Sequence, residues 1–150
     1  MRLLLVPFLA LLSACAAQPR LSHLQGAQVI SPAVAVLAAA DAAPGGFRGR
    51  FGFVVQRAEW VGPRLFLNSH PDYRDQRNLS VAIHPVAVRR LQAVYGSDLR
   101  RAFRHRQIVV DGMARRVRIN FTVNGRPSGK YYFQTHVVVT GPRQIFVVVS

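Results

Sequence analysis

The sequence after residue 47 alternates apolar and polar side chains over short runs that are separated by glycine, proline and asparagine. A two-residue period places one set of side chains on a single face of a β-strand, whereas an amphipathic helix needs a period near 3.6 residues. The clearest runs are 64–69, 79–83 and 114–123. Short strands bounded by turn residues are typical of a small barrel or sandwich. We therefore expect a mainly β domain.

The pattern predicts five strands. The first covers 51–60 and ends at the turn Val61-Gly62-Pro63, and Gly112 is expected to mark a bend or bulge inside the fourth. The segment from Asn124 to Lys130 is expected to be a loop, and residues 144–149 either continue the fifth strand or form a sixth strand near the first. The remaining predicted strands are 64–69, 79–83, 107–110 continuing into 114–123, and 131–139.

One longer helix is predicted between the third and fourth strands. Pro85 suits a first helical position, and Gly96 supplies a left-handed stop. Between them, apolar residues recur at helical spacing. Ser97-Asp98 can begin a second, short helical turn that presents Leu99 and Phe103 to the core.

Three strands, a helix and a long hairpin follow the element order of an OB-fold, a five-stranded barrel with its helix between strands three and four. Over residues 48 to 148 the chain resembles small bacterial OB-fold domains, including those appended to some thermonuclease-like secreted proteins. The resemblance implies one such domain over 47–150. It is carried by Gly52-Phe53-Val54-Val55, Leu65-Phe66-Leu67-Asn68, Tyr73-Arg74-Asp75, 79–83, 108–112 and 144–147.

The N-terminus has the composition of a secretory signal: Met1-Arg2 is followed by an apolar run to Leu12 and then by Ser13-Ala14. Leu12-Ser13-Ala14-Cys15 resembles the lipobox of bacterial lipoproteins. The resemblance implies cleavage after residue 14 and attachment of acyl chains, palmitate among them, to Cys15, which would anchor the protein to a membrane. In such lipoproteins an Asp directly after the lipidated cysteine favours retention in the inner membrane. This chain has Ala16 at that position, so the resemblance implies sorting to the outer membrane. The alternative is an ordinary secreted protein with a chance cysteine.

Residues 15–46 contain much alanine and little charge, and Pro44-Gly45-Gly46 closes the segment. We expect a flexible tether here. The alternative is that Val34 to Leu37 pack onto the domain.

Positive charge is concentrated after residue 46. Residues 47–150 contain 18 of the 20 basic residues and five of the six acidic ones. Such a field attracts anionic surfaces. Nineteen of the basic residues are arginine, so the same composition is also consistent with a GC-rich genome and no functional role.

OB-folds bind ligands on strands two and three together with two loops, and the resemblance implies the same surface here. Arginine beside aromatic rings suits anions and bases. Alternatively, Trp60 caps the barrel, Phe66 belongs to the core, and the arginines only solvate the surface. The candidate ligand-binding residues are Trp60, Arg64, Phe66, Asn68, Ser80, His84, Arg126, Lys130 and Tyr132.

The sequence offers little for catalysis or metal binding. A single cysteine excludes an internal disulfide, and the histidines do not form an HxxxH or HExxH pair. Asp72 and Asp75 lie beside Arg74 and Arg77, which indicates ion pairing rather than acid and base catalysis. We expect no enzyme activity, no metal and no cofactor.

The sequence thus predicts a monomeric, lipid-anchored, non-catalytic OB-fold-like module in the periplasm that binds an anionic or glycan ligand. A protein adaptor that docks a partner through a sheet edge or the long hairpin is the alternative. Nucleic acid is disfavoured by the compartment.

Overall fold

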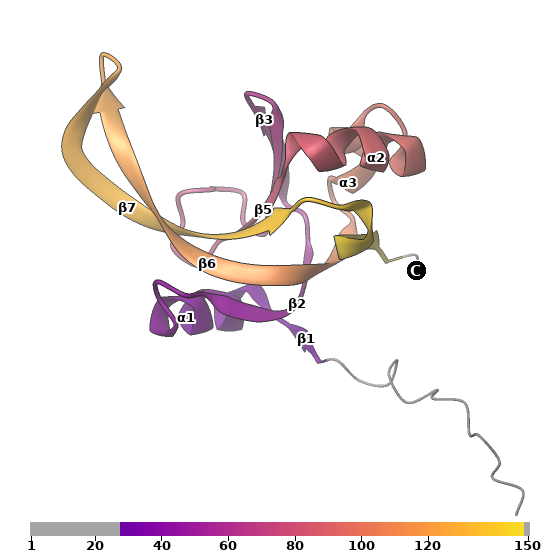
Figure 1. Cartoon of the computed structure of the whole chain (residues 1–150), viewed down its shortest axis with the longest axis horizontal. Coiled ribbons are helices and arrows are strands. Elements are labelled where there is room, and N and C mark those ends of the chain that lie inside the picture. The colour runs from indigo at the N-terminus through magenta and orange to yellow at the C-terminus, as the bar shows by residue number, and fades with distance from the viewer. Residues whose placement is uncertain (1–27, 149–150) are drawn as a thin grey trace, which may run out of the picture.

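The computed structural model describes residues 28–148, and its strands outweigh its helices, so the prediction of a mainly β domain is confirmed (Figure 1). The predicted targeting segment 1–14 and the predicted lipidation site Cys15 lie outside the described residues. The elements are β1 (Val29–Ile30), α1 (Pro32–Asp41), β2 (Phe47–Val54), β3 (Arg57–Val61), β4 (Arg64–Asn68), β5 (Leu79–Ile83), α2 (Pro85–Tyr95), α3 (Leu99–Phe103), β6 (Gln107–Val123), β7 (Arg126–Val139), the 3-10 turn η1 (Pro142–Gln144) and β8 (Ile145–Val147).

The strands form one mixed sheet in the order β1-β2-β6-β7-β5-β4-β3, with β8 on the second edge of β6. β1 pairs with β2 and β5 pairs with β7 in parallel, and the other pairs are antiparallel. The ladder is open, because β1 and β3 are its two ends. Residues 55 and 56 connect β2 to β3. The amide of Val55 donates to the carbonyl of Arg106, and the amide of Gln56 donates to the carbonyl of Asn68.

The predicted second and third strands and the main helix correspond to β4, β5 and α2. The predicted first strand is divided at Val55-Gln56, because its first half pairs with β6 and its second half with β4. The segment after η1 forms a separate short strand, β8, which pairs with β6 rather than with the first strand. With β1 these features raise the number of strands from the predicted five to eight.

The predicted bulge at Gly112 was wrong. The β2–β6 register runs through the pair Gly49 and Gly112 without a break, and the irregularity lies instead between Asn120 and Thr122. A Cβ atom at Gly112 would lie 2.6 Å from a methyl group of Val137. The glycine therefore permits a close approach of β6 to Val137 of β7.

The predicted loop from Asn124 to Lys130 was also wrong. β6 and β7 are joined by the two residues Asn124 and Gly125, whose φ angles of 50° and 75° match the type I′ turn that favours Asn-Gly. Strand β7 begins at Arg126, directly after the turn.

The helices begin and end as the sequence predicts. His84 caps α2 and Gly96 ends it with a φ of 92°, while Asp98 caps α3. Both helices lie on the side of the sheet away from α1 (Figure 1). They bury Leu91, Leu99 and Phe103 against the sheet.

The prediction of a flexible tether was wrong for residues 29–46. β1 extends the sheet, and α1 packs on it through Ala35 and Ala39, which are fully buried, while Val34 and Leu37 face solvent. The alternative of packing was thus right, but alanines rather than the larger side chains make the contact. None of the helices in the described part of the chain is long and apolar enough to cross a membrane.

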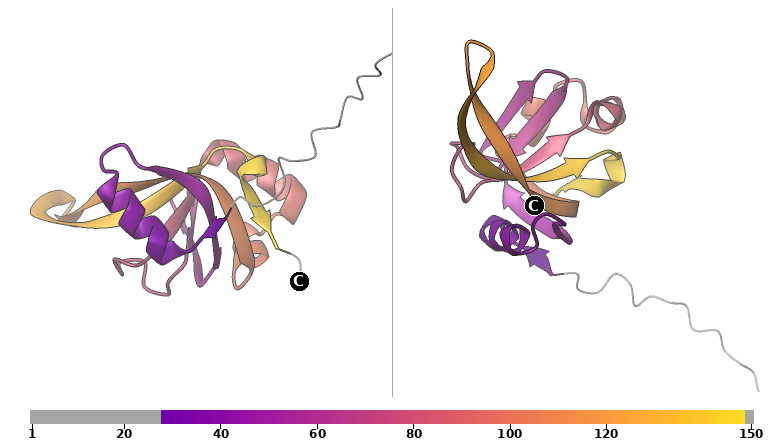
Figure 2. Two further views of the ribbon diagram at one scale, coloured as in Figure 1. Left: turned by 90° about the horizontal axis from the view of Figure 1, so that it is seen from below. Right: turned by 60° about the vertical axis from the view of Figure 1, so that its left-hand side comes forward.

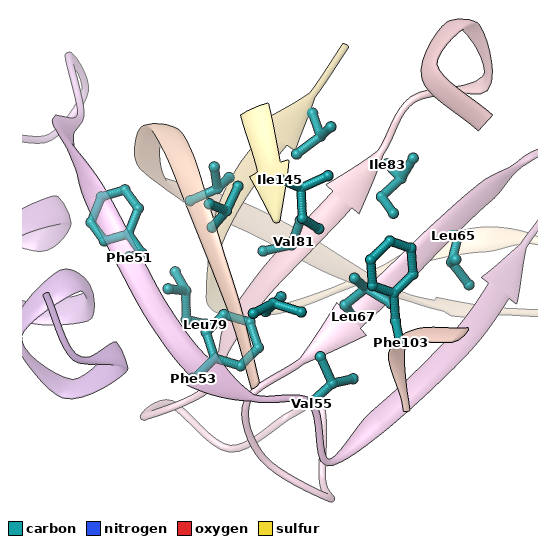
Figure 3. Close-up of a cluster of buried hydrophobic side chains, with 14 of the residues drawn as sticks. Phe51, Phe53, Val55, Leu65, Leu67, Leu79, Val81, Ile83, Phe103 and Ile145 are labelled. Atoms are coloured by element: carbon teal, nitrogen blue, oxygen red, sulfur yellow. The ribbon is translucent and has the colours of Figure 1, made fainter. Parts of the chain in front are cut away.

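One hydrophobic core fills the space between the sheet and the helices (Figure 3). Every described polar side-chain atom that is buried has a hydrogen-bond partner. Residues 28–148 therefore form a complete folding unit with its own core. Its largest buried side chains include Phe51, Phe103, Leu65, Leu67, Leu79, Ile83, Leu91 and Ile108.

Candidate functional site

Strands β6 and β7 continue beyond the sheet as a two-stranded arm, which we define as residues 115–134. Within the described residues, the strands of the arm pair only with each other, because β2 stops pairing with β6 at Ala114 and β5 begins to pair with β7 at Thr135. The arm projects from the body and curves (Figures 1 and 2). We call the face toward β3 the inner face and the opposite one the outer face.

A hollow of about 480 Å³ lies between the inner face and strands β3, β4 and β5. Alternation along each strand brings its lining together, since every second side chain points the same way. Its walls carry aromatic rings and its floor carries amides, a hydroxyl and an imidazole. The lining residues are Arg57, Glu59, Val61, Phe66, Asn68, Tyr73, Ser80, Ile119, Tyr132, Gln134 and His136.

The floor is a buried polar network centred on Asn78. Its side-chain amide donates to the Oδ1 of Asn68 at 3.0 Å and to the Oγ of Ser80 at 2.9 Å, and Ser80 donates to Asn68 at 2.7 Å. The Oδ1 of Asn78 accepts from Ser69 and from the backbone of His70. The network therefore fixes both the floor and the start of the loop after β4.

A second chain of hydrogen bonds runs up the arm wall. The Nε2 of His136 donates to the Oε1 of Gln134 at 2.7 Å, and the Nε2 of Gln134 donates to the hydroxyl of Tyr132 at 2.9 Å. Burial, with a smaller effect from Arg64, lowers the pKa of His136 to about 4. Burial also raises the pKa of Tyr132. Both groups are therefore neutral at pH 7.

The charges around the hollow are largely compensated. Arg57 forms a hydrogen-bonded ion pair with Glu59, its neighbour on the same face of β3. The hydrogen bond to Glu59 is the main reason why the pKa of Arg57 is raised. Arg74 lies over the ring of Tyr73 and donates to its hydroxyl at 3.1 Å. The lining thus presents rings and neutral polar groups, while the uncompensated cations stand at its margin.

The structure brings four of the nine predicted ligand-binding residues into the hollow. Phe66 and Tyr132 are wall residues, whereas Asn68 and Ser80, each 2% exposed, belong to the floor network. β5 is buried on both faces rather than on one, which is why Ser80 is covered. Arg64 shares a strand face with Phe66 and lies at the margin.

The other four predicted residues lie elsewhere. Trp60 is on the opposite face of β3, beside the core residue Ala58. His84 caps α2, where its Nδ1 accepts from the backbone of Val86 at 3.3 Å. Arg126 and Lys130 lie near the tip of the arm, and both are exposed.

Sequence reasoning missed seven of the eleven lining residues and Asn78 beneath them. Gln134 and His136 follow Tyr132 at a two-residue spacing, so alternation along the predicted strand 131–139 could have placed them on the same face. Asn78 precedes a clear strand by one residue, and only its burial reveals its role. Arg57 had no signal beyond its residue type, and Tyr73 was noted only as part of the pattern that resembles small OB-fold domains.

The outer face has a different chemistry. The guanidinium of Arg116 lies 3.8 Å from the ring centre of Phe133, and that of Arg118 lies 3.9 Å from the ring centre of Tyr131. The two rings meet edge to face at 5.6 Å. The result is a ladder of stacked cations and rings that faces solvent.

The loop after β4 contains the ion pair that the sequence predicts. Asp75 accepts from both Nε and Nη2 of Arg77, and these hydrogen bonds lower the pKa of Asp75. Asp72 instead accepts from the backbone of Arg74 at 2.9 Å. Within residues 28–148, no three metal-ligating side chains gather at one place.

No protein-family model matches the chain, and no curated protein matches it. Among solved structures, the chain is similar to part of a protein assigned as an aspartyl-tRNA synthetase from Leishmania major Friedlin, with a TM-score of 0.42 and 11% sequence identity. The match covers 88% of this chain and 23% of that protein, so this chain spans less than a quarter of its length.

Proposed function

We propose that the protein is a lipid-anchored, non-catalytic binding module of the bacterial envelope, with an OB-fold-like domain that holds a glycan segment in the hollow. The strand pairing supports the fold. We count β2 and β3 as two halves of strand one, β4 as strand two, β5 as strand three, β6 as strand four and β7 as strand five. Strand one then pairs with two, two with three, three with five, five with four and four with one, and only strands three and five are parallel. This is the order of an OB barrel with a divided first strand.

The observation that carries the ligand class is the neutral lining of the hollow. Arg57 is balanced by Glu59, and His136 is neutral at pH 7. Rings such as Phe66 and Tyr132 offer apolar faces to a sugar, and the amide of Gln134 offers hydrogen bonds to its hydroxyls. An anionic ligand would have no unpaired cation inside the hollow, so a glycan fits better than an anion.

Retention on immobilised oligosaccharides tests this proposal. We expect the fragment 28–148 to be retained by oligosaccharides from bacterial cell walls, and Tyr132→Ala to weaken retention about tenfold or more, since it removes a hot-spot ring from the wall. Tyr131→Ala is the matched control, because the neighbouring residue lies on the outer face.

Equal effects of the two tyrosine variants would contradict a site in the hollow. If the fragment were retained by an anionic polymer but not by oligosaccharides, and Tyr132→Ala abolished that retention, the ligand of the hollow would be an anion rather than a glycan. Circular dichroism of each variant establishes that it is folded.

The lipid anchor rests on the motif Leu12-Ser13-Ala14-Cys15 and is tested separately. In a Gram-negative host, mass spectrometry of the full chain should find an N-terminal Cys15 that carries acyl chains, and the protein should fractionate with the outer membrane. Cys15→Ser should release it from the membrane fraction. An uncleaved, unmodified N-terminus would refute the anchor without affecting the glycan site.

A role as a protein adaptor has one supporting observation. β3 is the end strand of the sheet and pairs only with β4 among the described residues, and Trp60 and Val61 on it are exposed. A partner could add a strand to this edge. Trp60→Pro would block such an addition, whereas the glycan proposal expects no loss from it, because Trp60 lies on the face of β3 away from the hollow.

A further inference from the structure

The arm carries positive charge that nothing on it balances. After Asp111 the sequence contains no acidic residue, so the arm itself carries none. Its cations are all exposed. They are Arg115, Arg116, Arg118, Arg126 and Lys130.

Stacking on rings holds two of these cations in a defined orientation. The guanidinium carbon of Arg116 lies 3.8 Å from the ring centre of Phe133 and that of Arg118 lies 3.9 Å from the ring centre of Tyr131, and the Nε of Arg118 also donates to the Oδ1 of Asn120 at 3.2 Å. A guanidinium edge suits a phosphate, which it can grip with two hydrogen bonds. The same stacking covers one face of each ring, and a nucleic-acid base would have to displace the arginine to stack there.

The distal half of the arm also exposes apolar side chains among these cations. Tyr131 is 49% exposed and Val123 61%. The arm stands clear of the body in every view, so its end can meet a flat surface without obstruction (Figures 1 and 2). Aromatic and apolar side chains mixed with arginine and lysine are typical of segments that lie at the membrane interface.

We infer that the distal end and outer face of the arm dock on an anionic phospholipid surface, with the cations on lipid phosphates and the apolar side chains at the interface. Charge complementarity and the exposed apolar residues favour a lipid surface over nucleic acid, whose backbone offers no apolar interface. The inference depends neither on the lipid anchor nor on the glycan site, because it concerns residues outside both.

Vesicle co-sedimentation of the fragment 28–148 tests the inference. We expect binding to vesicles of equal parts phosphatidylglycerol and phosphatidylcholine, weaker binding as salt increases, and little binding to pure phosphatidylcholine. Arg118→Gln with Arg126→Gln and Lys130→Gln should weaken binding about tenfold or more. The control removes the same charge from Arg89, Arg90 and Arg101, which are exposed on α2 and α3.

A second pair of variants separates apolar contact from charge. Val123→Ser should weaken vesicle binding about threefold. Val94→Ser, which changes an equally exposed valine on α2, should leave it unaltered.

Three results would overturn the inference. The first is an equal loss in the α2 and α3 control, which would show attraction by net charge alone. The second is equal binding to neutral vesicles. The third is tighter arm-dependent binding to single-stranded polynucleotide than to vesicles, which would make nucleic acid the partner. Tyr132→Ala should lower oligosaccharide retention but not vesicle binding, so failure of one proposal leaves the other intact.

Discussion

The inner and outer faces of the arm are made by the same two strands and contain the same kinds of residue, yet they present opposite surfaces. Tyr132 points into the hollow and hydrogen bonds to Gln134, whereas Tyr131, one residue earlier, is stacked under Arg118. The inner face is neutral and connected to a buried floor, and the outer face is cationic and exposed. Adjacent residues of one strand can therefore serve two different ligands.

The two faces also differ in what holds them in place. The hollow rests on Asn68, Asn78 and Ser80, which are buried and hydrogen-bonded to one another. The arm beyond Ala114 has no fully buried residue among those described. A change in the floor should therefore cost stability, and a change on the outer face should cost almost none.

The largest effect is expected at Asn78. Asn78→Ala removes an amide that joins five groups and leaves buried polar atoms without partners, so it should lower the free energy of unfolding by about 3 kcal/mol. Asn120→Ala on the arm should change it by less than about 0.5 kcal/mol. Urea unfolding of the fragment 28–148 measures both. Equal losses would mean that the arm is as integral to the fold as the floor.

A pH-dependent loss is expected from His136. Its pKa is about 4 in the folded protein, below its ordinary value, so the unfolded chain takes up a proton between about pH 6.5 and pH 4 while the folded chain does not. Stability should therefore fall as the pH falls through that window, by about 2 kcal/mol, since the side chain retains some exposure.

Urea unfolding of His136→Gln against wild type measures this contribution. The variant should lose the His136-dependent part of the slope. If the free energy of unfolding depended on pH in the same way for wild type and His136→Gln, His136 would be accessible to water at the floor of the hollow.

Local sequence patterns predicted the helices and strands that are determined by residues close together in the sequence. Pro85 and Gly96 bound α2, and the alternation at Leu65, Leu67 and 79–83 identified core strands, because these signals act within a few residues. The helix α1 escaped prediction because it packs through Ala35 and Ala39, which leave no stripe of large apolar residues.

The hollow could be predicted only in part. The resemblance to OB-folds selected Phe66 on the second predicted strand and Tyr132 beside the last predicted loop. Neither the resemblance nor the alternation shows which strand covers a face, so Asn68 and Ser80 were expected on the surface and are buried. Likewise, the apolar series that includes Val117 and Ile119 resembles a core strand. Its exposure on an arm depends on where β2 and β5 end, which is a property of the tertiary structure.

The smallest effect sharpens the contrast in charge. Glu59→Gln removes the carboxylate that balances Arg57, so the hollow becomes cationic. Retention by an oligosaccharide that carries carboxylates should rise severalfold and become sensitive to salt, whereas retention by a neutral oligosaccharide and binding to anionic vesicles should not change. Asp111→Asn is the matched control, because it frees Arg50 between β2 and β6, outside the hollow. If this control raised retention as much as Glu59→Gln, net charge rather than the lining would decide what the hollow binds.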